Sequence, residues 1–255
     1  MKVLVTGYKG FIGRHLYSHL QNLGFEVDGI DFPDDIGDFK TDKIYDVVIH
    51  LAAFAALRDS LKNPDKFWEN NVEKTKRIFS YCRDNDIRLL YASSAGVYGW
   101  WQNPYAITKK VNESMAPPDS VAMRFFNVWA EENSRPDMHY RMLQENTAEY
   151  ITKHKRDYIH VNDVVSAICH LIPSTFIGPI DIGIGESIPV MDIAKAMGRD
   201  LPIKDVVGEP DSLCADTTDL TALGWFPTIN IMDTLKDHES PKLATPLQEG
   251  AKANA

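Results

Sequence analysis

Tyr105 and Lys109 are the residues of this sequence whose types and spacing most clearly suggest chemistry. They stand four positions apart in Tyr105-Ala-Ile-Thr-Lys109, and this spacing puts a phenol and an ammonium on one face of a helix. A phenol with its ordinary pKa of about 10 is a poor base at neutral pH, but a neighbouring cation favours the phenolate and lowers that pKa. We therefore expect Tyr105 to act as a base beside Lys109.

Two serine hydroxyls add to this group of candidate catalytic residues. The segment Ala92-Ser-Ser-Ala95 closes an apolar, strand-like run, where a hydroxyl could hydrogen-bond the substrate oxygen whose proton Tyr105 removes. A tyrosine-lysine pair alone would more often be surface packing, and two serines at a strand end would more often form a turn. The functional interpretation depends on the elements that position these side chains.

The first thirty-one residues predict such an element. A strand over Lys2–Thr6 is followed by Gly7, Gly10 and Gly13, an amphipathic helix, a second strand and Asp31. In a dinucleotide-binding βαβ unit the first glycine allows a tight turn, the second leaves room for the pyrophosphate, and the third lets the helix approach the sheet. The pyrophosphate then lies on the helix N-terminus.

The residues after the second strand indicate which dinucleotide binds. Asp31 can accept hydrogen bonds from the ribose hydroxyls, and no arginine follows it. The next segment, Phe32-Pro-Asp-Asp35, carries carboxylates where a 2′-phosphate would need cations. The sequence therefore predicts NAD rather than NADP.

Strands and helices alternate through the first half of the chain. We expect buried strands at 46–53, 88–93 and 121–128 and helices at 64–83 and from residue 105. This pattern predicts an α/β fold, a Rossmann-type doubly wound parallel sheet with functional groups at the carboxyl ends of its strands.

The second half is less regular and predicts a small, discontinuous substrate lobe. We expect a NAD-binding domain over 1–128, a lobe over 129–239 from which 156–183 return to the Rossmann core, and a disordered tail over 240–255. A helix at 191–197 and the segment 222–227 are expected to cover the carboxyl edge of the sheet and enclose a substrate.

Composition narrows the possible partners. The chain has 255 residues and a net charge of -9 without a basic run, so we expect neither a nucleic acid nor a membrane as partner. Three separated cysteines and the lack of a signal peptide favour the cytoplasm. The histidines, including His50, His154 and His160, do not have metal-ligand spacing, so no metal is expected.

Seven segments occur in the order found in one known family. Together they resemble the extended short-chain dehydrogenase/reductase family, in particular its nucleotide-sugar epimerases and dehydratases. The resemblance covers most of the chain, through Val3-Leu-Val-Thr-Gly-Tyr-Lys-Gly-Phe-Ile-Gly13, Val48-Ile-His-Leu-Ala-Ala53, Asn70-Asn-Val72, Ser93-Ser-Ala-Gly-Val-Tyr-Gly99, Tyr105 to Lys109, Arg124-Phe-Phe-Asn127 and Arg156-Asp-Tyr-Ile-His-Val-Asn-Asp163.

The resemblance implies a role for each matching residue. Ser94, Tyr105 and Lys109 would form the catalytic triad. Asn127 and Arg156 would bind the diphosphate of a nucleoside-diphosphate sugar, whose sugar Ser94 would contact; a guanidinium fork suits phosphate oxygens. The residues that would bind NAD are Gly7, Gly10, Phe11, Ile12, Gly13, Asp31, Leu51, Ala52, Ala53, Asn71, Tyr105, Lys109 and Phe126.

Departures from the family pattern bear on the reaction. The 4,6-dehydratases carry an Asp-Glu pair after the catalytic hydroxyl, where this chain has Ala95 and Gly96, so we expect no 4,6-dehydration. Only five residues, Trp100-Trp-Gln-Asn-Pro104, separate Gly99 from Tyr105, and the segment from Asn127 to Arg156 is short for the family. The sugar and the nucleotide stay open.

The resemblance favours an NAD-dependent epimerase that oxidises the sugar transiently at C4 and reduces it again. One alternative is a nucleotide-sugar reductase or oxidative decarboxylase on the same scaffold. Another is an NAD-binding sensor or scaffold without turnover. Family members commonly pair through the helices that correspond to 64–83 and 105–116, so a homodimer is expected.

Overall fold

A six-stranded parallel sheet forms the centre of the computed structural model, which describes residues 1–132, 134–206 and 208–239. The strand order is β2-β1-β3-β4-β5-β9, so the direction of winding reverses between β1 and β3. This order confirms the predicted Rossmann-type α/β fold. The strands are β1 (Lys2–Thr6), β2 (Glu26–Ile30), β3 (Val47–His50), β4 (Arg88–Ser94), β5 (Val121–Phe125) and β9 (Gly178–Ile182).

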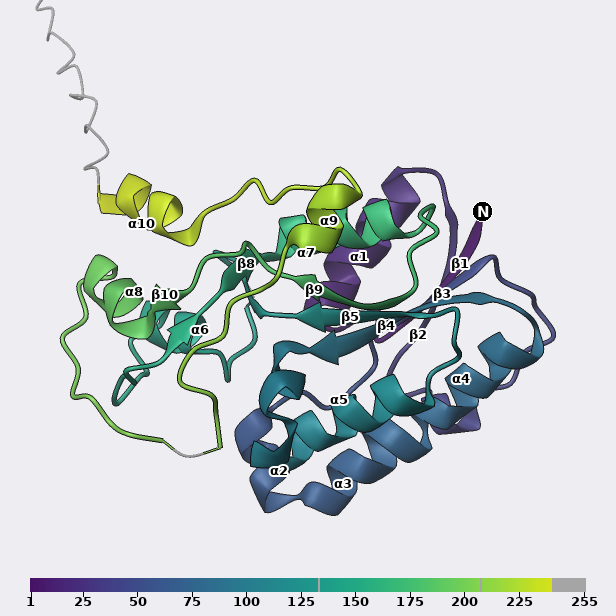
Figure 1. Cartoon of the computed structure of the whole chain (residues 1–255), viewed down its shortest axis with the longest axis horizontal. Helices are drawn as coiled ribbons and strands as arrows, with labels where there is room; N and C mark the ends of the chain where they lie inside the picture. Colours follow the sequence, from purple (N-terminus) through teal and green to yellow (C-terminus); the bar gives the residue numbers. More distant parts are fainter. Residues whose placement is uncertain (133, 207, 240–255) are drawn as a thin grey trace, which may run out of the picture.

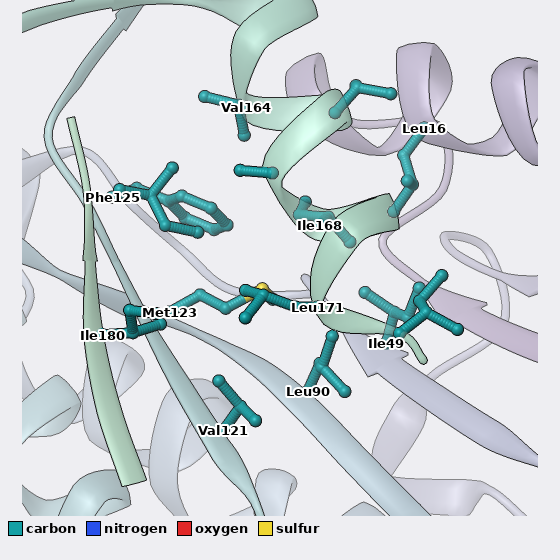
Figure 2. Packing of buried hydrophobic residues seen from close by; sticks show 14 of the residues in the cluster. Leu16, Ile49, Leu90, Val121, Met123, Phe125, Val164, Ile168, Leu171 and Ile180 are labelled. Atoms are coloured by element: carbon teal, nitrogen blue, oxygen red, sulfur yellow. The ribbon is translucent and has the colours of Figure 1, made fainter. Parts of the chain in front are cut away.

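Helices cover both faces of the sheet (Figure 1). Helices α1 (Phe11–Asn22) and α7 (Val161–Leu171) lie on one face, and α4 (Thr75–Asp84) and α5 (Pro104–Met115) lie on the other. The apolar residues of α7 recur at helical spacing, which gives the helix one side to bury. Figure 2 shows the result, with Val164, Ile168 and Leu171 packed on side chains of the sheet and on Leu16 of α1.

Both faces of the sheet are apolar because each one meets a helix layer. Ile49, Leu90 and Met123 point into the cluster with α1 and α7. Val48 and Leu89, their neighbours along the strands, belong to the cluster beneath α4. The unbroken apolar runs of these strands are thus explained by burial on both sides.

The expected helix over 64–83 consists of three segments. It contains α3 (Pro64–Trp68), the π-helical segment η2 (Glu69–Glu73) and α4. The shorter helices α2 (Leu57–Lys62) and η1 (Ile36–Asp38) precede it, and the 3-10 segment η3 (Ala95–Gln102) joins β4 to α5. The π-helical segment is a local widening of the kind that often accompanies functional positions.

A second, smaller cluster of buried residues forms the lobe around Trp129, Leu143 and Ile193. Its strands are only two or three residues long and pair across large sequence separations. The lobe contains β6 (Asn127–Trp129) paired with β8 (Tyr158–His160), β7 (Lys155–Arg156) paired with β10 (Ile188–Pro189), and the helices α6 (His139–Gln144), α8 (Val190–Ala196) and α10 (Ile231–Glu239).

Two details differ from the sequence-based expectations. The strand expected over 121–128 is interrupted at Phe126, because β5 continues the main sheet whereas β6 pairs with β8 of the lobe. The segment 222–227 does not cover the carboxyl edge of the sheet. It follows α9 (Thr218–Ala222), and Trp225 packs in the α1–α7 cluster and donates its indole N–H to Ser166 of α7 at 3.2 Å.

The boundaries proposed for the two domains remain a prediction, although α7 and β9 do pack with the main sheet. The predicted disordered tail, 240–255, lies outside the described residues. Within the part of the chain that is described, no helix is long and apolar enough to cross a membrane.

Candidate active site

The turn between β1 and α1 is crowded at its glycines. Gly7 has a φ of +73°, and a Cβ there would lie 2.7 Å from the Ala52 nitrogen. A Cβ on Gly13 would lie 2.0 Å from the Gly7 carbonyl oxygen. No side chain caps α1, and its first turn carries no acidic residue. The turn therefore presents uncapped backbone N–H groups, as the pyrophosphate of a dinucleotide requires.

Asp31 directly follows β2 at the same end of the sheet. Its carboxylate accepts the backbone N–H groups of Lys9 and Phe32, each at 2.7 Å. The Lys9 ammonium donates to the Phe32 carbonyl at 2.8 Å, so a cation lies beside this carboxylate. The segment 32–35 carries no cation, whereas Lys9, which the sequence did not reveal as a neighbour of Asp31, comes from the turn before α1. The role of Asp31 in holding the ribose stays a prediction.

A pocket of about 830 Å³ opens at the carboxyl ends of β1, β3, β4 and β5. Asp31, Ala52 and Asn71 are not part of its lining. The pocket thus brings together most of the predicted catalytic, cofactor-binding and substrate-binding residues. Those that line it are Gly7, Gly10, Phe11, Ile12, Gly13, Leu51, Ala53, Ser94, Tyr105, Lys109, Phe126, Asn127 and Arg156.

Asn71 and Ala52 support the pocket from behind its lining. Asn71 is fully buried, and its side chain accepts the Phe54 N–H and donates to the Phe54 carbonyl, both at 2.8 Å. These two hydrogen bonds fix the loop after β3, which lines the pocket. Ala52 donates its N–H to the Thr6 hydroxyl at 3.2 Å and lies beneath Gly7.

Helix α5, which carries Tyr105 and Lys109, begins at a capped turn. The Asn103 side chain accepts the Ala106 N–H at 2.8 Å, and the Tyr105 N–H bonds the Ser60 hydroxyl at 3.2 Å. Tyr105 therefore projects from the first turn of α5 toward β4, where Ser94 lies close enough to oppose the rise of the Tyr105 pKa. The phenol and the strand-end hydroxyl are thus neighbours, as expected.

Lys109 lies one turn further along α5 and is 3% exposed. Its ammonium donates to the Ala92 carbonyl at 2.8 Å and lies 5.9 Å from the centre of the Tyr105 ring. Burial, and to a smaller extent the Arg135 cation, lower the pKa of Lys109 to about 8. Lys109 is thus mainly protonated at neutral pH, yet it can give up a proton more easily than an exposed lysine.

The electrostatics of Tyr105 differ from the expectation. Burial raises the pKa of Tyr105, while the nearby Ser94 hydroxyl and the Arg135 cation oppose this rise. The expectation that Lys109 lowers the pKa of the phenol is wrong, because the ammonium faces the Tyr105 ring and the Ala92 carbonyl instead of the hydroxyl.

The far end of the pocket carries Phe126, Asn127 and Arg156. Phe126 and Asn127 occupy the point where the chain leaves β5 and enters β6. Arg156 is 5% exposed, and its guanidinium donates to Glu209 at 3.0 Å and to the His154 ring at 2.9 Å. A buried arginine needs such partners in the absence of a ligand, and the same fork can bind phosphate oxygens.

Sequence reasoning missed six charged residues of the lining. They are Arg58, Asp59 and Lys62 of α2, and Arg135, Asp137 and Glu209. Arg135 and Asp137 form an ion pair, and Glu209 is held by Arg156. None of these residues belongs to the motifs that were used, and only tertiary packing brings them to the pocket. The lobe side of the pocket is formed by residues 135–138, 156–158 and 209–213, whereas the helix expected at 191–197 does not line it.

No group of three or more His, Cys, Asp or Glu side chains in the described ranges could hold a metal ion. The backbone groups at the glycine turn of the pocket fit a dinucleotide. Its glycine turn leaves no room for side chains, and the uncapped N-terminus of α1 faces the place where a pyrophosphate would lie.

Known relatives share this architecture. The UDP-glucose 4-epimerase of Lactobacillus helveticus is 28% identical, with 89% of this chain and 92% of that protein covered. Protein CapI of Staphylococcus aureus is 30% identical over 68% of this chain and 69% of that protein. The solved structure of MoeE5 in complex with UDP-glucuronic acid and NAD has a TM-score of 0.81 and 25% identity, covering 92% of this chain and 97% of that one.

The alignment with the Lactobacillus enzyme extends over 304 positions, more than the 255 residues of this chain, so the chain lacks internal segments of that relative. Residues 3–185 match the sequence profile of a family described as NAD dependent, which confirms both the predicted family and the predicted cofactor. The chain belongs to the NAD dependent epimerase/dehydratase family.

Proposed function

We propose that the protein is an NAD-dependent epimerase that acts at C4 of a nucleoside-diphosphate sugar. The observation that carries the proposal is that Ser94, Tyr105 and Lys109 face the same pocket as Asn127 and Arg156. The first three suit the oxidation of an alcohol, and the last two suit a diphosphate. A relative with 28% identity is a UDP-glucose 4-epimerase, which supports this combination.

The chain's own residues would carry the proton and hold the substrate. Arg156 and Asn127 would hold the diphosphate, and Ser94 would bond the C4 oxygen. Tyr105 would take the C4 hydroxyl proton, helped by the nearby cation Arg135. NAD, held at the turn of Gly7, Gly10 and Gly13, would supply reversible hydride transfer at C4. Tyr105 would then give its proton back, so no net redox change would occur.

The residues after Ser94 support epimerisation over 4,6-dehydration. Ala95 is buried and Gly96 has no side chain, so neither can move the protons at C5 and C6. The 4,6-dehydratases described by the family resemblance place carboxyl groups at these two positions. We therefore expect no 4-keto-6-deoxy sugar from this protein.

Arg135 favours a sugar that carries a negative charge. It lies in the pocket close enough to lower the pKa of both Tyr105 and Lys109. In the free protein Asp137 neutralises it. A uronic acid would place its carboxylate on the carbon next to C4, where a cation beside the reacting groups could bind it. MoeE5, at 25% identity, has been solved with UDP-glucuronic acid and also with UDP-glucose.

The same substrate would suit an oxidative decarboxylase, because a 4-keto uronic acid loses carbon dioxide readily. The decarboxylase and a reductase are the alternatives to the epimerase. They would be identified by their product or by a net change in the amount of NADH. A sensor or scaffold without turnover would bind NAD and convert no sugar.

The test is proton NMR of the purified protein with NAD and UDP-, GDP- and dTDP-sugars, UDP-glucuronic acid among them. Epimer signals with NAD unchanged would support the proposal. A pentose product or accumulating NADH would transfer the assignment to a decarboxylase or dehydrogenase. The Tyr105→Phe variant should bind NAD normally and lose about 10²- to 10⁴-fold in turnover. Turnover near that of the wild type would remove Tyr105 from the role of base.

We also propose that the protein pairs through α3, α4 and α5. Trp68 of α3 is 42% exposed, and Ile107 and Val111 of α5 are half-buried, which leaves apolar surface on these helices. Sedimentation as a monomer at micromolar concentration would contradict the dimer. The cytoplasmic location stays a prediction.

A further inference from the structure

We propose that Glu113 and Arg124 are positioning residues whose ion pair holds the catalytic helix α5 so that Tyr105 stays in contact with Ser94. The proposal rests on the role of Tyr105 as the base in the proposed function. Neither residue lines the pocket, so both would act through the residues that do.

The ion pair is a two-point contact between helix and sheet. Arg124 of β5 donates from Nε to Glu113 Oε1 at 2.8 Å and from Nη2 to Oε2 at 2.9 Å. The side chains are 16% and 8% exposed. A bidentate arginine-carboxylate pair fixes the relative orientation of its two partners as well as their distance. Glu113 lies one turn beyond Lys109, so this contact sets the rotation of the end of α5.

The same carboxylate is tied to the strand that carries the catalytic hydroxyl. The Ser93 hydroxyl donates to Glu113 Oε1 at 2.7 Å, and Ser93 directly precedes Ser94 on β4. Glu113 therefore connects the helix that bears Tyr105 with the strand that bears Ser94. Lys109 also reaches β4 through the Ala92 carbonyl, but its ammonium is a group that the reaction uses.

Arg124 is itself held from the opposite side. Its Nη1 donates to the Tyr98 hydroxyl at 3.1 Å, and that hydroxyl donates to Asp181 of β9 at 2.8 Å. Asp181 also accepts the Asp216 N–H at 3.0 Å. Every polar group in this chain of contacts has a partner, so the arginine fork has a defined position to which Glu113 must adapt.

Two other hydrogen bonds of α5 are made to neighbouring helices and not to the strands. The Tyr105 N–H bonds Ser60 of α2, and the Asn112 amide donates to the Asn71 carbonyl of η2 at 2.9 Å. These contacts hold α5 against neighbouring helices. The Glu113 pair holds it against the strands β4 and β5, which is the direction that separates Tyr105 from Ser94.

A shift of α5 would have a specific electrostatic consequence. The nearby Ser94 hydroxyl lowers the pKa of Tyr105 against the effect of burial. If α5 rotates or moves away from β4, this stabilisation of the phenolate is lost and the phenol titrates at a higher pH. Loss of folding stability alone would not move that titration.

The experiment compares Arg124→Lys and Glu113→Gln with Lys110→Ala. Lysine keeps the charge but lacks the fork, and glutamine keeps the shape but turns an N–H group toward Arg124. Lys110 contacts the same carboxylate at 3.6 Å from an exposed position, so its removal is the matched control. The ionisation of Tyr105 is followed by ultraviolet difference absorbance against the Tyr105→Phe variant, without substrate.

We expect Tyr105 to titrate at higher pH in both test variants, with NAD affinity unchanged and turnover lowered by about 10- to 100-fold. The control should titrate like the wild type. An unchanged titration in a folded variant with only a lower melting temperature would overturn the proposal. If the Arg124→Lys variant does not fold, the titration of Tyr105 in the Glu113→Gln variant tests the proposal. A shifted titration in a protein that converts no sugar would support the positioning role while refuting the proposed epimerase.

Discussion

The sheet domain and the lobe reach a buried core in different ways. In the sheet domain, strands of four to seven residues pair in continuous register. In the lobe, Arg156 pairs with Ile188 and Asn127 pairs with Tyr158 through strands of only two or three residues. Both regions join distant parts of the chain, but the lobe has the shorter strand ladders and depends more on its apolar cluster around Trp129, Leu143 and Ile193.

Polar burial does not separate the two regions. Among the described residues, Trp129, Thr152 and Tyr158 of the lobe and His15, Arg88 and Asn112 of the sheet domain each bury a side-chain polar atom without a hydrogen-bond partner. Such a group costs about 1–3 kcal/mol when it stays unpaired. Because its strands are shorter, we expect the lobe to open before the sheet domain.

The largest effect should come from Gly13→Ala in the cofactor half. The added Cβ would lie 2.0 Å from the Gly7 carbonyl oxygen, so the turn and the start of α1 must separate. We expect NAD affinity to fall at least about 100-fold because the uncapped N–H groups are displaced. Gly24→Ala is the control, since nothing lies within 4 Å of a Cβ there; its φ of +80° means that alanine lowers stability, but it should leave NAD affinity unchanged. Titration calorimetry with NAD measures both, and retained binding by Gly13→Ala would show that the turn is not the cofactor site.

Truncation of buried side chains should affect the sheet domain and the lobe differently. Ile168→Ala in the α1–α7 cluster and Leu143→Ala in the lobe cluster each remove a fully buried side chain and should cost about 2–5 kcal/mol. Only the first should reduce the stability of the whole sheet, seen in denaturant unfolding. The second should weaken UDP binding and leave NAD binding intact. Equal loss of NAD binding by both variants would show that the two regions unfold as one.

Arg156→Lys should act on the lobe side of the pocket alone. The buried guanidinium bonds Glu209 and His154, and lysine cannot reproduce its fork. We expect UDP to bind about tenfold more weakly, because one of two charge-assisted bonds to the diphosphate is lost. NAD affinity should not change. Arg83→Lys is the matched control at an exposed ion pair; similar loss of UDP binding there would refute a role specific to Arg156.

The smallest effect concerns the pH dependence of the sheet domain. Burial, and then the Lys109 cation, lower the pKa of His50 to about 3, against an ordinary value of about 6.5. Between these values the unfolded chain binds more protons, so stability falls as the pH falls, by up to about 1.4 kcal/mol per pH unit.

His50→Asn should remove this contribution to the slope. Its absolute stability will also change, because His50 bonds Thr6 at 2.6 Å and Thr75 at 3.0 Å. The slopes of unfolding free energy against pH, measured from about pH 6.5 downward, are therefore the quantities to compare. Parallel curves for variant and wild type would contradict a neutral, buried His50.

The sequence anticipated the cofactor half better than the substrate half. The glycine turn, the strand before it and α1 are contiguous, so a local pattern defines them. The apolar runs at 47–50 and 88–94 identified strands because both of their sides are buried. The break at Phe126 was not foreseen, since β6 looks like a continuation of β5 until its partner β8 is known.

The residues of the candidate site also divide into those that a sequence motif predicts and those that only packing brings to the pocket. Ser94, Tyr105 and Lys109 could be named from their motifs, and the structure brings them together. The raised pKa of Tyr105 could not be foreseen, because burial and the neighbourhood of Arg135 follow from packing. Arg135 and Glu209 have no motif, and they reach the pocket from segments 30 and 104 positions beyond Tyr105.

By itself, the sequence determined the family, the cofactor class and the order of strands and helices, because these depend on short-range spacing and on runs of apolar residues. Only the tertiary structure decided which charges share the pocket, how α5 is held against β4 and β5, and where the lobe closes the site. Those features arise from contacts between residues far apart in the chain, and no local pattern encodes them.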